Sequence, residues 1–468
     1  MTRLTRTTPA PAQGIVHLGL GAFFRAHGAL YVEEAMAASG GDWGITGVSL
    51  KSPGQRDRLA PQCGTYTAVE LGPEGETARH VSVIREVLVA PEDPAAVLAA
   101  LRTARLVTLT ITEKGYCHIP ATGRLDLAHP VIRADLANPE APASAIGYLT
   151  RALAARRDAG EPPFTVLSCD NIPGNGALLR GLVLELAGEI DPALAAWIAA
   201  EGAFPSSMVD RIVPATTEAD IARTEALTGL HDAAPVMHEP FRQWVIEDHF
   251  AGPRPDLAAA GAELVEDVTP FEHMKLRCLN GTHSALAYLG YLSGAETISD
   301  AVAHPALAAY VRHLWAEEIL PVLTAPPGTS LPDYADALFR RYANPAIRHR
   351  TWQIAMDGSQ KLPQRLLGTI GENFSAGRSP RGLFLAVAAW MIYTSGRDLH
   401  GAAIDVRDPL ADRLGACWPG APAEVTARYL AIEEVFGPAP DPALAEGLTA
   451  ALTALLTSGP ETAAQQVI

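Results

Sequence analysis

Short apolar segments alternate with helical patterns through the first 270 residues. From Gly14 the sequence GIVHLGLGAFFRAHGALYVEEAMAASG predicts a strand, a glycine turn and a helix that ends at Gly40 and Gly41. The segments WGITGVSL, LVTLTITEKGY and FTVLSCDNIPGNG predict three more strands, and residues 94–101 and 144–155 read as helices. This alternation predicts an α/β fold with a mostly parallel sheet, whose ligands lie at the carboxyl ends of the strands.

The pattern changes to long helices after about residue 270. Helical periodicity marks MKLRCLNGTHSALAYLGYL, LAAYVRHLWAEEILPVL, LFLAVAAWMIYTSG, VTARYLAIEEVFG and residues 443–456. We therefore predict two domains, with residues 1–270 forming a Rossmann-like dinucleotide-binding domain and residues 271–468 forming a mainly α-helical one.

Composition narrows the class of protein. The chain has 468 residues, 48% hydrophobic and 19% charged, which excludes wholesale disorder. Its formal charge of −16 disfavours nucleic acid as a partner. Five scattered cysteines predict reduced thiols in the cytoplasm and no zinc site. The apolar run 382–396 is too short to span a membrane, so we expect a buried helix there.

The glycine turn is the first candidate site. Gly19 and Gly21 follow a strand and open a helix, where a pyrophosphate can approach the backbone; Phe24 replaces the third glycine of the usual motif. From the local pattern alone, an ordinary turn is equally compatible. The second strand ends in Ser49-Leu50-Lys51-Ser52 without the usual acidic residue, and Lys51 could accept a 2′-phosphate, so both NAD and NADP remain open.

The segment KLRCLNGTH is the second candidate. On an α-helix Asn280 lies about 140° and His283 about 80° from Lys275, so the three can face one cleft. A desolvated lysine can exchange a proton with an alcohol, and an asparagine can donate a hydrogen bond to the developing alkoxide. The alternative is an amphipathic helix with a solvated lysine.

Polar residues also follow two predicted strands. Asp170 and Asn171 lie after one strand, and Glu113 and Lys114 lie after another. They can contribute to a site at the ligand edge of the sheet, or merely cap a turn and form a solvated loop.

Taken together, these segments resemble the long-chain mannitol dehydrogenase family of polyol dehydrogenases and hexuronate reductases. The resemblance runs from about residue 14 to beyond 400 and rests on seven segments in order: IVHLGLGAFFRAH, TITEKGY, SCDNIPGNG, FPSSMVDRIVPAT, EPFRQWVIED, KLRCLNGTHS and HRTWQIAMDGSQKLPQR. It implies metal-free hydride transfer with a nicotinamide cofactor in a cleft between two domains.

The resemblance also implies roles for individual residues. Lys275 matches the catalytic lysine, Asn171 and Asn280 the asparagines that stabilise the oxyanion, and His283 the histidine that orients the substrate. Glu113 matches a glutamate in proton passage. The loop of Gly19 and Gly21, which continues into Ala22 and Phe23, matches the family's cofactor turn, and Asp210 and Lys361 match further residues of the cleft. Lys51 is expected at the cofactor because of its position after the second strand, and Arg350 is expected at the substrate because of its charge.

The substrate is expected to be a sugar acid. The blocks TEKGYC and RHRTWQIAMDGSQKLPQR look more like the hexuronate reductases, and four cations, Arg348, Arg350, Lys361 and Arg365, could hold a carboxylate. We expect interconversion of D-fructuronate and D-mannonate by a monomer or small homo-oligomer. The alternative functions are a mannitol or related polyol dehydrogenase and a sensor that has lost the reaction. The alternative role of the four cations is to pair with acidic residues of the protein.

Overall fold

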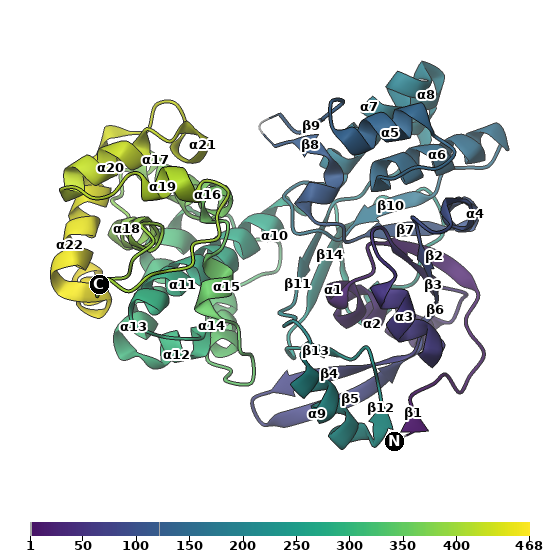
Figure 1. Ribbon diagram of the computed structural model, residues 1–468, viewed down its shortest axis with the longest axis horizontal. Coiled ribbons are helices and arrows are strands. Elements are labelled where there is room, and N and C mark those ends of the chain that lie inside the picture. Colours follow the sequence, from purple (N-terminus) through teal and green to yellow (C-terminus); the bar gives the residue numbers. More distant parts are fainter. Residues whose placement is uncertain (1, 121) are drawn as a thin grey trace. The chain divides into compact units, whose positions relative to one another are not determined.

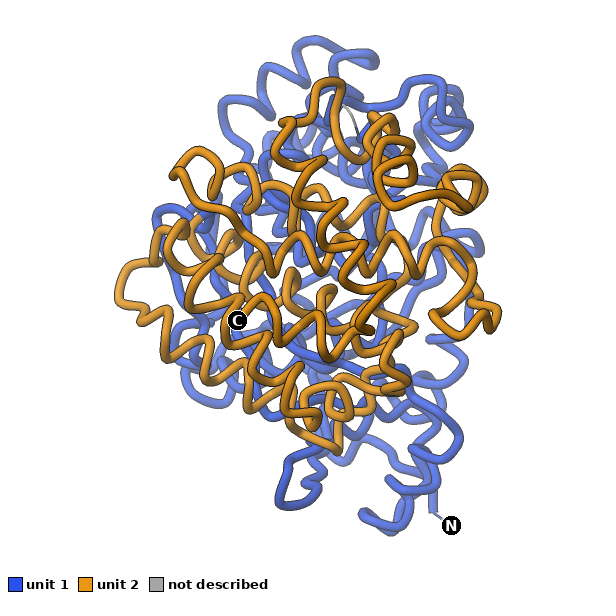
Figure 2. The backbone as a smooth tube through the Cα atoms, turned by 90° about the vertical axis from the view of Figure 1, so that its left-hand side faces the viewer, with its two compact units in different colours: residues 1–269 blue, residues 270–468 orange. Residues whose placement is uncertain are grey.

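The computed structural model describes residues 2–120 and 122–468. The chain divides into two compact units, Met1–Thr269 and Pro270–Ile468, which are coloured separately in Figure 2.

A five-stranded parallel sheet organises the first unit (Figure 1). Its spatial order is β10, β7, β2, β3, β6, so the first of the five strands in the chain lies in the middle and the order reverses between β2 and β7. This is the Rossmann arrangement, and the expected fold class is confirmed. The strands are β2 (Gln13–Leu18), β3 (Gly44–Ser49), β6 (Ile84–Val89), β7 (Leu106–Leu109) and β10 (Thr165–Ser168).

Helices cover both faces of this sheet. Along β2, Ile15 belongs to one apolar cluster, whereas Val16 and Leu18 belong to a second cluster on the opposite face. The predicted helices at 94–101 and 144–155 are present as α4 and α6, and the side chains of Asp93 and Ser144 cap their first turns. The helices are α1 (Ala22–Ala26), α2 (Gly28–Ser39), α3 (Gly54–Leu59), α4 (Pro94–Thr103), α5 (Pro130–Ala137), α6 (Ala145–Asp158), α7 (Asn175–Ile190), α8 (Pro192–Glu201) and α9 (Glu218–Thr228).

Two three-stranded sheets add to the unit, and their strands were not expected from the sequence. One has the order β13, β4, β5 and the other β11, β14, β15. Strand β5 is mostly exposed, so it carries no apolar pattern to mark it. The strands are β4 (Tyr66–Gly72), β5 (Gly75–Val81), β11 (Ser207–Asp210), β13 (Val236–His238), β14 (Gln243–Glu247) and β15 (Glu263–Val265).

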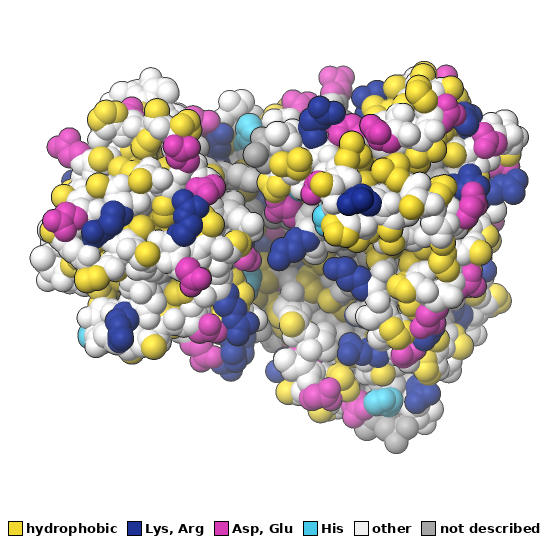
Figure 3. All heavy atoms as spheres, turned by 45° about the horizontal axis from the view of Figure 1, so that its top comes forward, with side chains coloured by type: hydrophobic (Ala, Val, Ile, Leu, Met, Phe, Trp, Pro, Cys, Tyr) yellow, Lys and Arg dark blue, Asp and Glu magenta, His cyan; other side chains and the backbone are white. Residues whose placement is uncertain are grey.

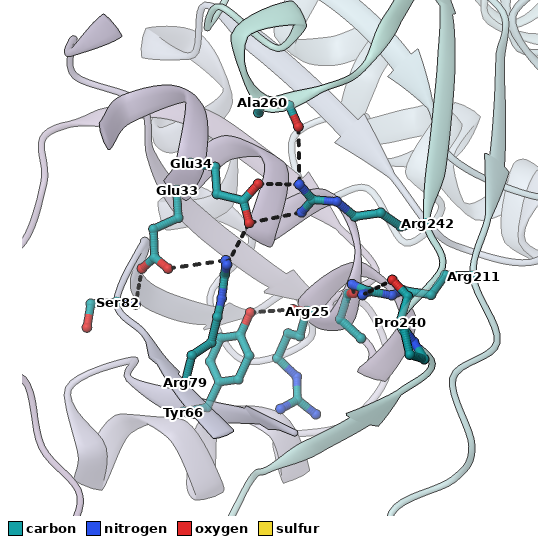
Figure 4. A network of polar contacts seen from close by, with 11 residues as sticks. Arg25, Glu33, Glu34, Tyr66, Arg79, Ser82, Arg211, Pro240, Arg242 and Ala260 are labelled. Carbon is teal, nitrogen blue, oxygen red and sulfur yellow. Dashed lines mark hydrogen bonds and ion pairs between the residues drawn. The ribbon is translucent and has the colours of Figure 1, made fainter. Parts of the chain in front are cut away.

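An ion-pair network ties α2 to this added structure (Figure 4). Glu34 on α2 binds Arg242 at 3.0 Å and Arg79 of β5 at 2.5 Å. Its neighbour Glu33 accepts the backbone N–H of Ser82 at 2.5 Å. Because four groups share the charges, the network holds α2 more firmly than an isolated surface pair would.

The second unit is helical, as predicted. The apolar run 382–396 forms the buried helix α18, and α22 packs along it with a kink at Gly459. None of the described helices is both long and apolar enough to cross a bilayer. The α-helices are α10 (Thr269–Met274), α11 (Thr282–Leu292), α12 (Ile298–Ala303), α13 (Pro305–His313), α14 (Leu331–Tyr342), α15 (Thr351–Ala355), α16 (Gly358–Leu362), α17 (Gly368–Ser375), α18 (Arg381–Tyr393), α19 (Ala411–Gly415), α20 (Pro422–Leu430), α21 (Glu433–Phe436) and α22 (Pro442–Val467).

Three segments of this unit are π-helical, which the sequence pattern did not indicate. They are η4 (Lys275–Gly281), η5 (Leu314–Ile319) and η7 (Pro363–Leu367), and η4 packs against both of the others. π-Helical turns are rare and frequently occur at functional sites.

Basic and acidic side chains are interspersed over the face shown in Figure 3. All five cysteines are free; Cys63 is exposed and the others are buried. Among the described residues, no group of three or more His, Cys, Asp and Glu side chains could hold a metal ion.

Candidate active site

The turn after β2 has a backbone that requires glycine. Gly19 has φ of +89°, and a Cβ there would lie 2.3 Å from the carbonyl oxygen of Thr110. Gly21 precedes α1, and no side chain of the described residues caps that helix. The N–H groups of Ala22 and Phe23, which begin α1, are therefore available at the turn.

A buried histidine fixes this turn. The Thr110 hydroxyl donates to the Gly19 carbonyl at 2.9 Å, so it must accept from Nε2 of His17, also at 2.9 Å. Nδ1 of His17 then accepts from the Thr108 hydroxyl at 2.8 Å. Burial lowers the pKa of His17 to about 3, so its ring is neutral and stacks on Phe24.

The far end of α1 is also held in place (Figure 4). Arg211 donates to the carbonyl of Ala26 at 2.7 Å, and the Tyr66 hydroxyl donates to the carbonyl of Arg25 at 2.6 Å. These bonds satisfy carbonyls that a helix end leaves open. The short helix after the glycine turn is thus anchored at its C-terminus by residues distant in sequence.

The end of β3 lies beside the turn, since Gly19 donates to the carbonyl of Val48 at 2.9 Å. Ser49 is buried there, and its hydroxyl has no hydrogen-bond partner among the described residues. Lys51 is exposed two residues further on. The edge that would meet a cofactor ribose therefore carries a hydroxyl and a cation in place of a carboxylate.

Asp170 connects the ends of β7 and β10. Its buried carboxylate accepts the N–H groups of Ile111 at 3.0 Å and Thr112 at 2.9 Å, and the Tyr116 hydroxyl at 2.9 Å. Burial raises the pKa of Asp170. Asp170 thus holds the loop after β7 instead of capping the next helix, and it stabilises Thr112 at a φ of +64°.

Two predicted site residues adjoin this carboxylate. Glu113 is exposed and begins the short 3₁₀ helix after Thr112, and the exposed Asn171 follows Asp170 directly.

Asp210 is buried at the end of β11. The buried amide of Asn175 bonds both the Asp170 carbonyl at 2.9 Å and the Ser207 carbonyl at 2.8 Å, which links the loop after β10 to the start of β11.

The π-helical geometry changes the predicted arrangement of Lys275 and Asn280. The segment η4 runs from Lys275 to Gly281, and hydrogen bonds in a π-helix join residues five apart. Asn280 therefore lies closer to the face of Lys275 than an α-helix would place it. Lys275 is only 7% exposed, and the side-chain oxygen of Asn280 is buried without a partner among the described residues.

His283 lies in a buried aromatic group one turn further on. Its ring stacks on Tyr342 at 5.2 Å and meets the edge of His349 at 4.8 Å. Burial lowers the pKa of His283 well below its ordinary value, and neighbouring cations lower it further. Neutral His283 can donate one hydrogen bond and accept another. His349 was missed by the sequence reasoning.

The four expected cations separate into two pairs. Arg348 and Arg350 are exposed, at 69% and 58%, and both lie near Glu296. Lys361 and Arg365 are more buried, and among the described residues neither forms an ion pair with a carboxylate. Lys361 donates to the carbonyl of Met356 at 2.5 Å, and Arg365 donates to the Ser284 hydroxyl at 3.0 Å. The carboxylate-binding role expected of these four cations stays a prediction.

The sheet order, the glycine turn and the buried lysine define a nicotinamide-dependent oxidoreductase. Family models agree: the model "Mannitol dehydrogenase Rossmann domain" matches residues 13–259, and "Mannitol dehydrogenase C-terminal domain" matches residues 267–456. The chain belongs to the mannitol dehydrogenase family, whose members act on CH–OH groups.

Individual relatives support the same conclusion. The chain is 48% identical to D-mannonate oxidoreductase of Escherichia coli (strain K12), over 87% of this chain and 86% of that protein. It is 41% identical to mannitol 2-dehydrogenase of Cereibacter sphaeroides, over 98% and 97%. The structure of Pseudomonas fluorescens mannitol 2-dehydrogenase with NAD and D-mannitol is 38% identical, with a TM-score of 0.88 over 98% of this chain and 94% of that chain.

Proposed function

We propose that this protein interconverts D-fructuronate and D-mannonate by NAD-dependent hydride transfer. The observation that carries the substrate assignment is the pair of largely buried cations, Lys361 and Arg365, neither of which forms an ion pair with a carboxylate of the described residues; Asp357 and Asp408 act on Lys361 only from a greater distance. A substrate carboxylate would supply the missing charge, whereas a neutral polyol would not. The 48% identity to D-mannonate oxidoreductase points the same way.

The residues around the glycine turn fit a dinucleotide. A Cβ on Gly21 would meet only the carbonyl of Gly19, at 3.8 Å, so the backbone there is open to a pyrophosphate. We assign Gly19, Gly21, Ala22 and Phe23 to this contact. When bound, NADH supplies the hydride that reduces the C5 ketone. Lys51 is proposed to lie near the adenosine ribose, where it would tolerate a 2′-phosphate.

The chain's own residues handle the proton and the oxygen. We propose that Lys275 protonates the alkoxide that forms on reduction, because its ammonium group is buried in the candidate site and can donate a proton to an oxygen bound there. Asn280 and Asn171 donate hydrogen bonds to the same oxygen and stabilise its charge. His283 orients a neighbouring hydroxyl, and Glu113 passes the proton between Lys275 and solvent.

Asp210 and Lys361 are assigned to the substrate. Asp210 is buried at a strand end and can accept hydrogen bonds from sugar hydroxyls. Arg350, which the sequence also suggested for the substrate, is exposed and lies 3.6 Å from Glu296. The five free thiols support a cytoplasmic location.

The test is a comparison of substrates with the purified protein. NADH oxidation is followed with fructuronate, tagaturonate and fructose, and the best substrate is repeated with NADPH. We expect fructuronate to give the highest kcat/KM. A preference for fructose would assign the protein to the polyol dehydrogenases and contradict the proposed carboxylate contact.

A further inference from the structure

Several buried polar atoms of the second unit have no hydrogen-bond partner among the described residues, and three of them belong to the candidate site. These three are Oδ1 of Asn280, Nε2 of His283 and Nδ1 of His349. Leaving such a group unpaired is costly, so a cluster of them indicates a place where a ligand supplies the partners. Asn280 and His283 already have proposed roles. His349 has none.

The ring of His349 is held in a defined position. Its backbone N–H donates to Ile347 at 2.9 Å, and its carbonyl accepts from Ile298 of α12 at 3.1 Å. The ring edge meets His283, which is only 6% exposed, at a centroid distance of 4.8 Å. His283 in turn stacks on Tyr342. The two imidazoles therefore belong to one rigid group.

Cations surround this group. Lys361 acts electrostatically on both histidines, and Arg365 and Arg341 act on His283. Burial and Lys361 together lower the pKa of His349 to about 4, so the imidazole is neutral at physiological pH and carries one N–H. A ligand that satisfies these surroundings must bring negative charge and hydrogen-bond acceptors, which describes a carboxylate.

We propose that His349 is a specificity-determining residue for the sugar-acid substrate, and that its Nδ1–H donates a hydrogen bond to the substrate carboxylate held by Lys361 and Arg365. This inference rests on the proposed function and adds a residue to it. A polyol has no carboxylate to accept this bond, so His349 raises affinity for the acid selectively.

The test compares two variants with a matched control. His349→Leu removes the donor, and His349→Gln keeps an amide N–H in its place. His400→Gln changes an exposed histidine of the same unit and serves as the control. KM and kcat are measured with D-mannonate and with D-mannitol, and the unfolding midpoint of each variant verifies that it is folded.

We expect His349→Leu to raise KM for mannonate about 10- to 100-fold, the loss of one hydrogen bond to a charged group, while KM for mannitol stays unchanged. His349→Gln should recover part of the loss, and His400→Gln should behave like the wild type. Equal losses for both substrates would indicate a merely structural role and overturn the inference, as would an unchanged KM for mannonate.

The wild-type protein separates this inference from the proposed function. If it turns over only polyols, the proposed function fails, and His349 is then tested by inhibition of mannitol oxidation with mannonate. Inhibition that is lost in His349→Leu would sustain the carboxylate contact. Absence of inhibition in the wild type, or equal inhibition of the variant, would refute it.

Discussion

At the scale of single residues, the neighbours of a basic side chain decide whether it forms an ion pair and how far its pKa is shifted. Arg348 and Arg350 share Glu296 at the surface, and such exposed pairs contribute little to stability. Among the described residues, Lys361 donates to main-chain carbonyls and lies near Arg365, so burial and repulsion lower its pKa from 10.5 to about 8. The Lys361 side chain therefore changes between its charged and neutral forms near pH 8.

This shift predicts the pH dependence of substrate affinity. Below pH 8 Lys361 is protonated and attracts a carboxylate; above pH 8 it becomes neutral, so KM for mannonate should rise by up to about tenfold per pH unit. Asp357 and Asp408 oppose the shift and Arg365 enhances it. The measurement is KM against pH for mannonate and mannitol.

The matched variant is Lys361→Arg, whose guanidinium stays charged at every pH used. It should flatten the rise for mannonate, and mannitol should show no rise in either protein. If KM for mannitol rises in parallel, the titrating group acts on binding in general and the assignment to Lys361 is wrong.

The sequence predicts the position of residues along the chain better than their partners. Gly19 and Lys275 stand out because a glycine turn and a helical segment surround them. The pairing of Arg350 with Glu296 cannot be predicted from the sequence, because the two residues lie 54 positions apart and only the fold brings them together. The same holds for His349, whose contact with His283 spans 66 positions.

At the scale of elements, the contact between two π-helical segments is unusually close. Gly281 ends η4, and a Cβ there would lie 2.7 Å from the carbonyl oxygen of Arg365 in η7. Glycine is required at this position by contact and not by backbone conformation. The approach also connects the segment that carries Lys275 with the one that carries Arg365.

We therefore expect Gly281→Ala to lower the free energy of unfolding by about 1–3 kcal/mol, because the backbone must move to accept the methyl group. Denaturant unfolding measures this. The control is Gly371→Ala within α17, where a Cβ would meet nothing within 4 Å and should stabilise the helix by about 0.5–1 kcal/mol. Similar effects of both substitutions would mean that the contact is not tight.

An apolar pattern led to the prediction of some buried strands but not of all. Strands β2, β3, β7 and β10 are largely buried and read clearly from the sequence, whereas the exposed β5 does not. Strands β4, β11 and β14 are also largely buried and were not predicted. The helix expected after the glycine turn is divided at His27. The apolar periodicity did not indicate the π-helical turn at Lys275, which packs against η7 in the fold.

At the scale of the whole molecule, each unit has its own interior, and the glycine turn belongs to the first. NAD at about 100 times its Kd should raise the free energy of unfolding by about 2.7 kcal/mol. The Gly19→Ala variant should lose this effect, because its methyl group would meet Thr110 at the turn. Thermal unfolding with and without NAD measures both.

Two variants complete this experiment. Gly40→Ala also has positive φ, +70°, but a Cβ there meets nothing within 4 Å, so stabilisation by NAD should persist. Lys275→Ala should likewise keep it while losing most turnover. Stabilisation of Gly19→Ala equal to that of the wild type would place the cofactor elsewhere.

The unequal exposure of the five thiols has a practical consequence. Cys63 lies at the surface and Cys117, Cys169, Cys278 and Cys417 are buried, so a bulky maleimide dye should attach at one position of the native protein. A fluorophore at Cys63 would label the first unit without any mutagenesis. With a second dye on a thiol engineered into the helical unit, energy transfer between the two dyes would measure the distance between the units during turnover.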